Sequence, residues 1–156
     1  MIQRLQSVYL LLVTVLMSLF LVMSYAEISL GDNEVIRFYC FAIQKHLDDE
    51  KTELVRRTLP LVVMVLLSGM TSFVNIFLHR KRPLQMRICV LTSVVLIAQL
   101  GLSYFYYSGF KSDYGQDQAS FTLSAIFPVV CIILLMMAYR SIRHDETLVQ
   151  SYNRIR

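Results

Sequence analysis

Hydrophobic positions in this chain fall into four long blocks separated by polar segments. Each block is about 20 residues long and contains no Asp, Glu, Lys or Arg; the blocks are Ser7–Ala26, Thr58–Leu78, Ile88–Ser108 and Ala119–Tyr139. A helix rises about 1.5 Å per residue, so about 20 apolar residues cross a hydrocarbon core of about 30 Å. The pattern predicts an all-α integral membrane protein, a four-transmembrane-helix bundle that forms a single domain over residues 1–156.

The segment between the first two blocks predicts a short cap on one side of the membrane. Residues 27–41 favour two short extended runs around a turn. Residues 34–43 are too apolar for a free loop, and their pattern fits either a strand or a helix. The acidic residues at 48–50, followed by Arg56 and Arg57, favour a helix whose dipole they would complement.

Lysine and arginine residues are distributed unevenly between the two sides of the blocks. One side, with both termini and the turn after the second block, carries nine of the 15, and the other carries six. Cytoplasmic loops are enriched in Lys and Arg, so we expect cytoplasmic termini, with residues 27–57 and 109–118 outside. The same rule explains the net charge of +4, and we predict no nucleic-acid partner. Ser24-Tyr25-Ala26 resembles a signal-peptide cleavage site, but the apolar run before it is too long, so we expect a retained span.

Polar residues inside the blocks predict how the helices pack. Ser68 and Ser72 lie four residues apart on one face of the second block, and Asn75 can hydrogen-bond to a neighbouring helix. Gln99, near the middle of the third block, is costly to expose to lipid and should face inward. We therefore predict that Asn75 and Gln99 are intramembrane packing residues.

The fourth block and the tail form the last predicted elements. Pro128 lies inside the block, where it should free a carbonyl and kink the helix. Apolar residues of the tail recur at helical spacing, which predicts an amphipathic cytoplasmic helix on anionic lipid or against a partner. These residues are Ile142, Leu148, Val149, Tyr152 and Ile155.

The chain carries little that points to catalysis. No block contains an ionisable residue of the kind that a proton- or ion-coupled transporter uses. His46 with the acids at 48–50 is the one cluster that resembles a metal site, and a single His is a poor anchor. Cys40, Cys89 and Cys131 do not make a disulfide framework and should be buried small residues. Nucleophile, zinc-protease, phosphate-loop and Cys-x-x-Cys motifs are lacking, so we predict no catalytic residue, metal or cofactor.

Three segments of the sequence are distinctive. Residues 1–10 open with Met-Ile-Gln-Arg, residues 80–89 read Arg-Lys-Arg-Pro-Leu-Gln-Met-Arg-Ile-Cys, and residues 140–151 contain Arg-x-Asp-Glu-x-Leu-Val. In these segments the chain resembles the bacterial family called domain of unknown function 4293, small four-span inner-membrane proteins. The resemblance covers essentially the whole chain and implies an inner-membrane location, with no implied activity.

All three segments lie on the cytoplasmic side of the predicted topology. Their polar residues are more varied than a topology-setting turn or a lipid-surface helix requires. The arginines could pair with the two acids and cap the bundle. We predict a cytoplasmic interaction face made of Arg4, Gln85, Arg87, Arg143, Asp145 and Glu146.

Small size, uncharged spans and small or polar packing faces favour a non-enzymatic function. We expect an accessory, assembly or scaffolding subunit of a bacterial inner-membrane complex, in contact with the bilayer and with a membrane-protein partner or a second copy. A second interpretation is a small oligomeric channel or transporter, with Asn75 and Gln99 lining a wet path. A third is a membrane-embedded enzyme, which reactivity of Cys40 or a bound cofactor would support.

Overall fold

Four helices run along the molecule. The computed structural model describes residues 3–29, 34–47, 51–78, 82–114 and 119–154. The helices are α1 (Gln3–Val22), α2 (Leu59–Phe77), α3 (Arg82–Tyr114) and α4 (Phe127–Arg154).

Apolar helices dominate the described part of the chain. Three segments there are long and apolar enough to cross a membrane: Leu59–Phe77, Pro83–Gly109 and Leu123–His144. The apolar part of α1, Gln6–Val22, is shorter. The structure therefore has the predicted succession of four apolar helices, three of them of full spanning length.

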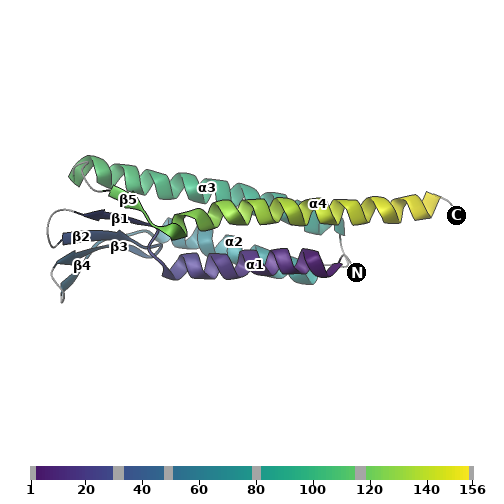
Figure 1. Cartoon of the computed structure of the whole chain (residues 1–156), viewed down its shortest axis with the longest axis horizontal. Coiled ribbons are helices and arrows are strands. Elements are labelled where there is room, and N and C mark those ends of the chain that lie inside the picture. Colours follow the sequence, from purple (N-terminus) through teal and green to yellow (C-terminus); the bar gives the residue numbers. More distant parts are fainter. Residues whose placement is uncertain (1–2, 30–33, 48–50, 79–81, 115–118, 155–156) are drawn as a thin grey trace.

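The helices pack as a ring in which each contacts two others. α1 packs against α2 and α4, and α3 packs against the same two helices. Consecutive helices run in opposite directions, so α1 begins and α4 ends at the same end of the bundle (Figure 1). We call this the terminal end, and we call the opposite end, which carries the strands, the sheet end.

Five strands form one antiparallel sheet at the sheet end (Figure 1). They are β1 (Ala26–Ser29), β2 (Glu34–Phe38), β3 (Ala42–Leu47), β4 (Lys51–Arg57) and β5 (Ala119–Phe121). Their spatial order is β4-β3-β2-β1-β5. β5 comes from the connection between α3 and α4, and its Ala119 pairs with Ile28 of β1. The sheet thus joins the α1–α2 connection, which contains β1 to β4, to the α3–α4 connection, which contains β5.

The sheet shows that the all-α prediction is wrong. The two extended runs predicted over residues 27–41 are confirmed as β1 and β2. Residues 34–43, which fitted either a strand or a helix, form β2, a turn and the start of β3. The helix predicted before Arg57 is wrong because Lys51–Arg57 pairs with β3 as β4. Pairing with β3 and the rest of the sheet outweighs a dipole preference worth less than about 1 kcal/mol. The acids at 48–50 lie outside the described residues.

The first predicted span is also too long at its sheet end. α1 ends at Val22 instead of Ala26. The Tyr25 N–H donates to the carbonyl of Phe38 (2.9 Å), so the chain has already entered the sheet at this point. Helix and strand compete for the same backbone groups, and the sheet takes them here.

The fourth predicted span begins too early for a related reason. Residues 119–121 form β5, and a 3₁₀ turn, η3 (Leu123–Ile126), comes before α4. Pro128 is therefore the second residue of α4. A proline is well placed there because the first helical N–H groups have no partner within the helix. The predicted kink in the interior of the fourth helix is wrong.

Aromatic rings connect the bundle to the sheet. Ring centroids lie 6.0 Å apart between Phe20 and Tyr25, and 6.0 Å apart between Tyr25 and Phe38. The series continues through Tyr107, 6.1 Å from Phe38, to Phe121, 4.4 Å from Tyr107. These contacts link α1, β2, α3 and β5, so the sheet is packed onto the helices as part of the same core.

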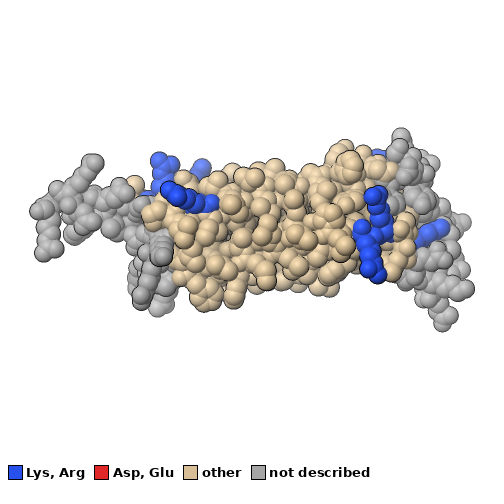
Figure 2. Space-filling model, turned by 180° about the vertical axis from the view of Figure 1, so that it is seen from behind, with Lys and Arg blue, Asp and Glu red and all other residues tan. Residues whose placement is uncertain are grey.

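Charged side chains lie near the ends of the molecule. In the view from behind, Lys and Arg atoms appear towards both ends, and the broad middle of this face carries none (Figure 2). Large apolar side chains are exposed along the helices, among them Met70 and Val63. An apolar girdle between two charged ends is the surface that a bilayer requires.

Candidate functional site

Two polar side chains hold α2 to α3 at the terminal end. The Asn75 side-chain amide donates to the carbonyl of Gln85 (3.3 Å), and the Gln85 amide donates to the carbonyl of Asn75 (3.2 Å). The Asn75 Nδ2 atom also lies 3.2 Å from the sulfur of Cys89. All three side chains are buried. We call Asn75 and Gln85 the amide clamp, because each side chain satisfies the backbone of the other.

Hydroxyl groups continue this interface towards the sheet end. Thr92 donates to the carbonyl of Ile88 (2.8 Å) and lies 3.1 Å from the hydroxyl of Thr71. Ser68 and Ser72 are fully buried on the same side of α2. The sequence singled out these two serines as a packing face, and the structure places them inside the bundle. The α2–α3 interface therefore contains small polar residues, as helix–helix interfaces in membranes commonly do.

Gln99 differs from Asn75, the other predicted intramembrane packing residue. Its side chain is fully buried, and neither its amide nitrogen nor its amide oxygen has a hydrogen-bond partner among the described residues. Other described buried polar atoms without a partner are the Tyr25 hydroxyl, the Ser72 hydroxyl, Asn75 Oδ1 and Gln85 Oε1. An unpaired buried polar group costs about 1–3 kcal/mol. These uncharged polar atoms lie in an interior that is otherwise largely apolar.

The predicted cytoplasmic interaction face is placed only in part. Arg87 and Arg143 are exposed on α3 and α4. Gln85 belongs to the amide clamp and is 2% exposed, so it contributes to packing and not to a surface. Helical spacing explains this, because Gln85 and Cys89 share one face of α3 while Arg87 lies on another. The side chains of Arg4, Asp145 and Glu146 lie outside what the structure describes.

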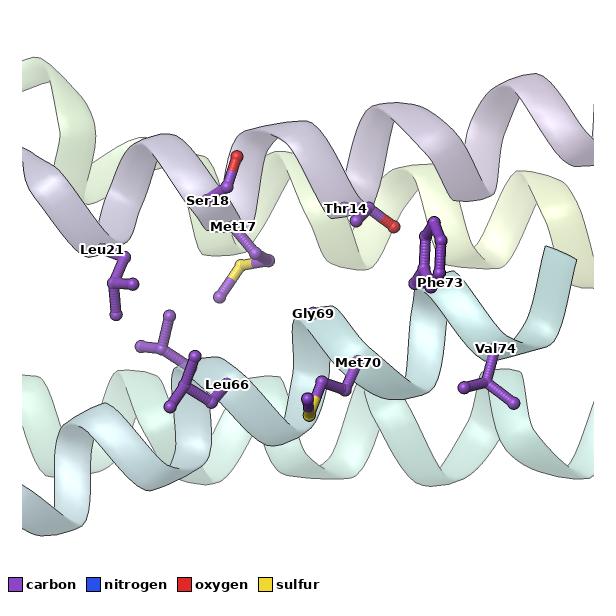
Figure 3. A pocket seen from close by; sticks show the side chains of 10 residues that line it. Thr14, Met17, Ser18, Leu21, Leu66, Gly69, Met70, Phe73 and Val74 are labelled. Carbon is purple, nitrogen blue, oxygen red and sulfur yellow. The ribbon is translucent and has the colours of Figure 1, made fainter.

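A groove runs between α1 and α2 on the outside of the bundle (Figure 3). It has a volume of about 360 Å³ and a fully apolar lining surface. Its lining residues are Thr14, Met17, Ser18, Leu21, Val65, Leu66, Gly69, Met70, Phe73 and Val74.

Small residues line part of the groove. A Cβ atom on Gly69 would meet Met17 Cβ at 3.8 Å, an ordinary van der Waals contact, so Gly69 lets α2 lie close to α1. Thr14 and Ser18 lie four residues apart on α1, and their hydroxyls donate to the carbonyls of Leu10 (3.0 Å) and Val15 (2.7 Å). The groove lining is therefore apolar. Sequence reasoning missed the α1 side of it, although the spacing of Thr14 and Ser18 was a usable signal.

Cys40 lies at the junction of the sheet and the helices. Its thiol donates to the carbonyl of Phe20 (3.2 Å), and its own carbonyl accepts from the Thr58 hydroxyl (2.7 Å). Burial raises the pKa of the Cys40 thiol to about 12. The thiolate is the reactive form of cysteine, so Cys40 is a poor nucleophile at neutral pH. Cys40, Cys89 and Cys131 are all free and buried, as predicted.

Charged and potential metal-binding side chains form few clusters among the described residues. An ion pair joins Arg37 to Glu27 (3.2 Å) at the sheet end. The described residues contain no group of three His, Cys, Asp or Glu that could hold a metal ion. The weak candidate built on His46 includes acids at 48–50 that lie outside these residues.

The fold and these contacts define a small, mostly helical membrane protein. Its sheet joins the α1–α2 connection to the α3–α4 connection at one end. The chain belongs to the family described as Domain of unknown function (DUF4293), which matches residues 2–155. The resemblance drawn from the three distinctive sequence segments is thereby confirmed. No match was found among curated proteins.

Proposed function

We propose that this protein is a non-enzymatic accessory, assembly or scaffolding subunit of a bacterial inner-membrane complex. The observation that carries the proposal is the open apolar groove between α1 and α2, at the depth of the apolar girdle. We infer that all four helices span the membrane, with both termini in the cytoplasm. The excess of Lys and Arg on the side of the termini supports this orientation.

The groove has the features of a seat for one transmembrane helix of a partner. Helices in lipid associate where small residues let their backbones approach closely. Gly69 supplies that approach from α2, and Thr14 and Ser18 supply it from α1. The groove lining is apolar, and the Thr14 and Ser18 hydroxyls donate within α1, so we expect its occupant to be apolar over this length. Met70 and Phe73, both more than half exposed, would pack on the flanks of the incoming helix.

Filling the groove tests the proposal. Gly69→Leu would place a side chain in the groove that Gly69 lines, with its Cβ in ordinary contact with Met17 Cβ at 3.8 Å. Gly101→Leu is the matched control, because a Cβ there meets no atom within 4 Å and Gly101 is exposed on α3. Both variants and the wild type would be purified from native membranes in mild detergent, with quantitative mass spectrometry of the co-purifying proteins.

We expect the wild type and Gly101→Leu to retain a near-stoichiometric membrane partner. Gly69→Leu should lose that partner by about tenfold or more, equivalent to about 1.4 kcal/mol of binding free energy. Equal abundance and equal thermal stability of the two variants would show that folding is unaffected. A wild-type protein that purifies alone, or retention of the partner by Gly69→Leu, would contradict the proposal.

An oligomeric channel is the second candidate, and one observation favours it. The Gln99 amide is buried without a partner among the described residues, as it would be if it served a path that opens in another state. Asn75 argues the other way, because both of its amide contacts hold α2 to α3. We therefore keep the subunit as the leading proposal.

A further inference from the structure

The outermost strand of the sheet, β4, has an open edge. In the described sheet, β4 pairs with β3 alone, and its other edge has no neighbouring strand. The opposite edge is formed by β5, which has three residues, whereas β4 has seven. Proteins commonly protect sheet edges by keeping the edge strand short, which here applies only to β5. A row of free backbone N–H and C=O groups is the template for adding a strand.

The side chains of β4 also leave this edge accessible. Leu54 is 61% exposed and Val55 is 39% exposed, although both are large and apolar. Arg56 and Arg57 are exposed beside them. A bulge between β3 and β4 falls at Val55, but pairing with β3 resumes on both sides of it. The edge therefore combines backbone donors and acceptors with apolar contact surface, outside the apolar girdle.

The charge of β4 indicates what kind of segment could pair with its open edge. The strand contains Lys51, Arg56 and Arg57 against a single acid, Glu53. The Arg56 guanidinium lies 5.9 Å from the ring centroid of Tyr106, which holds this cation over the end of α3. Opposite charges across neighbouring strands stabilise pairing, and like charges oppose it. A strand added to β4 would therefore carry carboxylates opposite the two arginines.

A second copy of this chain does not meet that requirement. The strands run along the long axis of the bundle (Figure 1), so copies inserted the same way in one membrane have β4 strands that point in the same direction. A twofold axis along the membrane normal would bring two β4 strands together, each with three cations and one acid. The two strands would carry the same net positive charge, which disfavours self-pairing.

We propose that the β4 edge binds an extended, acidic segment of a membrane-protein partner as a sixth strand of the sheet. The inference rests on the proposed function in that it requires such a partner, but its surface is separate from the α1–α2 groove. The segment belongs to the part of the partner that lies outside the cytoplasm, on the same side as the sheet.

Site-specific photo-cross-linking in native membranes tests this inference. A photoreactive amino acid would replace Leu54 on the edge or, as the matched control, Leu123, which is 74% exposed at the same end beside β5. The cross-linked peptides would be sequenced by mass spectrometry. Each position would be combined with Arg57→Glu and with Lys111→Glu, which makes the same charge change on α3, off the edge.

We expect Leu54 to cross-link to a net-acidic segment of one membrane protein and Leu123 not to do so. Arg57→Glu should lower that product by about tenfold or more, with little effect of Lys111→Glu. Backbone amides of Lys51–Arg57 should exchange with solvent about tenfold more slowly in the purified complex than in the protein alone, as added strand pairing requires. Cross-linking to lipid, to a second copy or to a neutral or basic segment would overturn the inference.

The two proposals fail in different ways. If the wild-type purification recovers a partner but Leu54 gives no acidic cross-link, the β4 inference is wrong and the subunit proposal stands. If neither experiment recovers a partner, the subunit proposal is itself wrong, and the β4 inference falls with it.

Discussion

Gln99 brings a side-chain amide into the interior of the bundle and gives it no partner among the described residues. In a subunit with a packed interior, this amide stays out of contact with water. In an oligomeric channel, it would line a hydrated path. The chemistry of a single position can therefore separate the two candidate functions.

We predict that a cysteine at position 99 is protected from water-soluble thiol reagents. Gln99→Cys, in a background where Cys40, Cys89 and Cys131 are alanine, should react with a water-soluble maleimide about 100-fold more slowly than Phe41→Cys. Phe41 is 50% exposed and serves as the accessible reference. Both sites should react fully after denaturation in SDS. Comparable rates in the native protein would favour the channel.

Individual side chains were predictable where the bilayer decides their placement. Asn75 and Gln99 had to face inward because lipid cannot satisfy an amide. Gln85 was placed on an interaction face because a topology-setting basic turn does not require an amide, whereas the structure buries it against α2. Its position on the same helical face as Cys89 was visible in the sequence, but the residue it contacts was not.

At the scale of elements, the amide clamp fixes one helical hairpin. We predict that Asn75→Ala lowers the free energy of unfolding by about 1–2 kcal/mol, because it removes the side-chain contacts to the Gln85 carbonyl and to Cys89 across the α2–α3 interface. Val74→Ala is the control, since Val74 is 51% exposed on the outside of α2, and it should cost about 0.5 kcal/mol or less. Unfolding in mixed detergent micelles with increasing SDS measures both. An equal loss in the two variants would show that the clamp adds nothing beyond side-chain volume.

Elements inside the apolar blocks were predictable, and elements outside them were less so. About 20 uncharged residues determine a spanning helix almost alone. β4 was predicted as a helix because its acid-to-base order resembles a helix dipole pattern, and only the neighbouring β3 makes it a strand. Pro128 was placed in mid-helix because nothing local revealed that β5 occupies residues 119–121. Strand partners distant in sequence leave no periodic signal.

At the scale of the whole molecule, the topology makes a direct prediction. Phe41→Cys at the sheet end should react with a membrane-impermeant maleimide in cells whose outer membrane alone is permeable, and Thr147→Cys near the end of α4 should not. Both should react once the inner membrane is opened. Cys40, Cys89 and Cys131 contribute little background because they are buried. The reverse labelling pattern would invert the proposed orientation.

The pairing of β5 with β1 also sets an order of events during synthesis. β1 leaves the ribosome early, and residues 119–121 follow only after α3 has been made. Until then the exposed side of β1 has no strand to close it, and an incomplete chain carries unpaired backbone there as well as at β4. The hydrogen bonds between β5 and β1 therefore form only in chains whose third helix has already been made. A chain interrupted before residue 119 would leave that side of β1 without its partner strand.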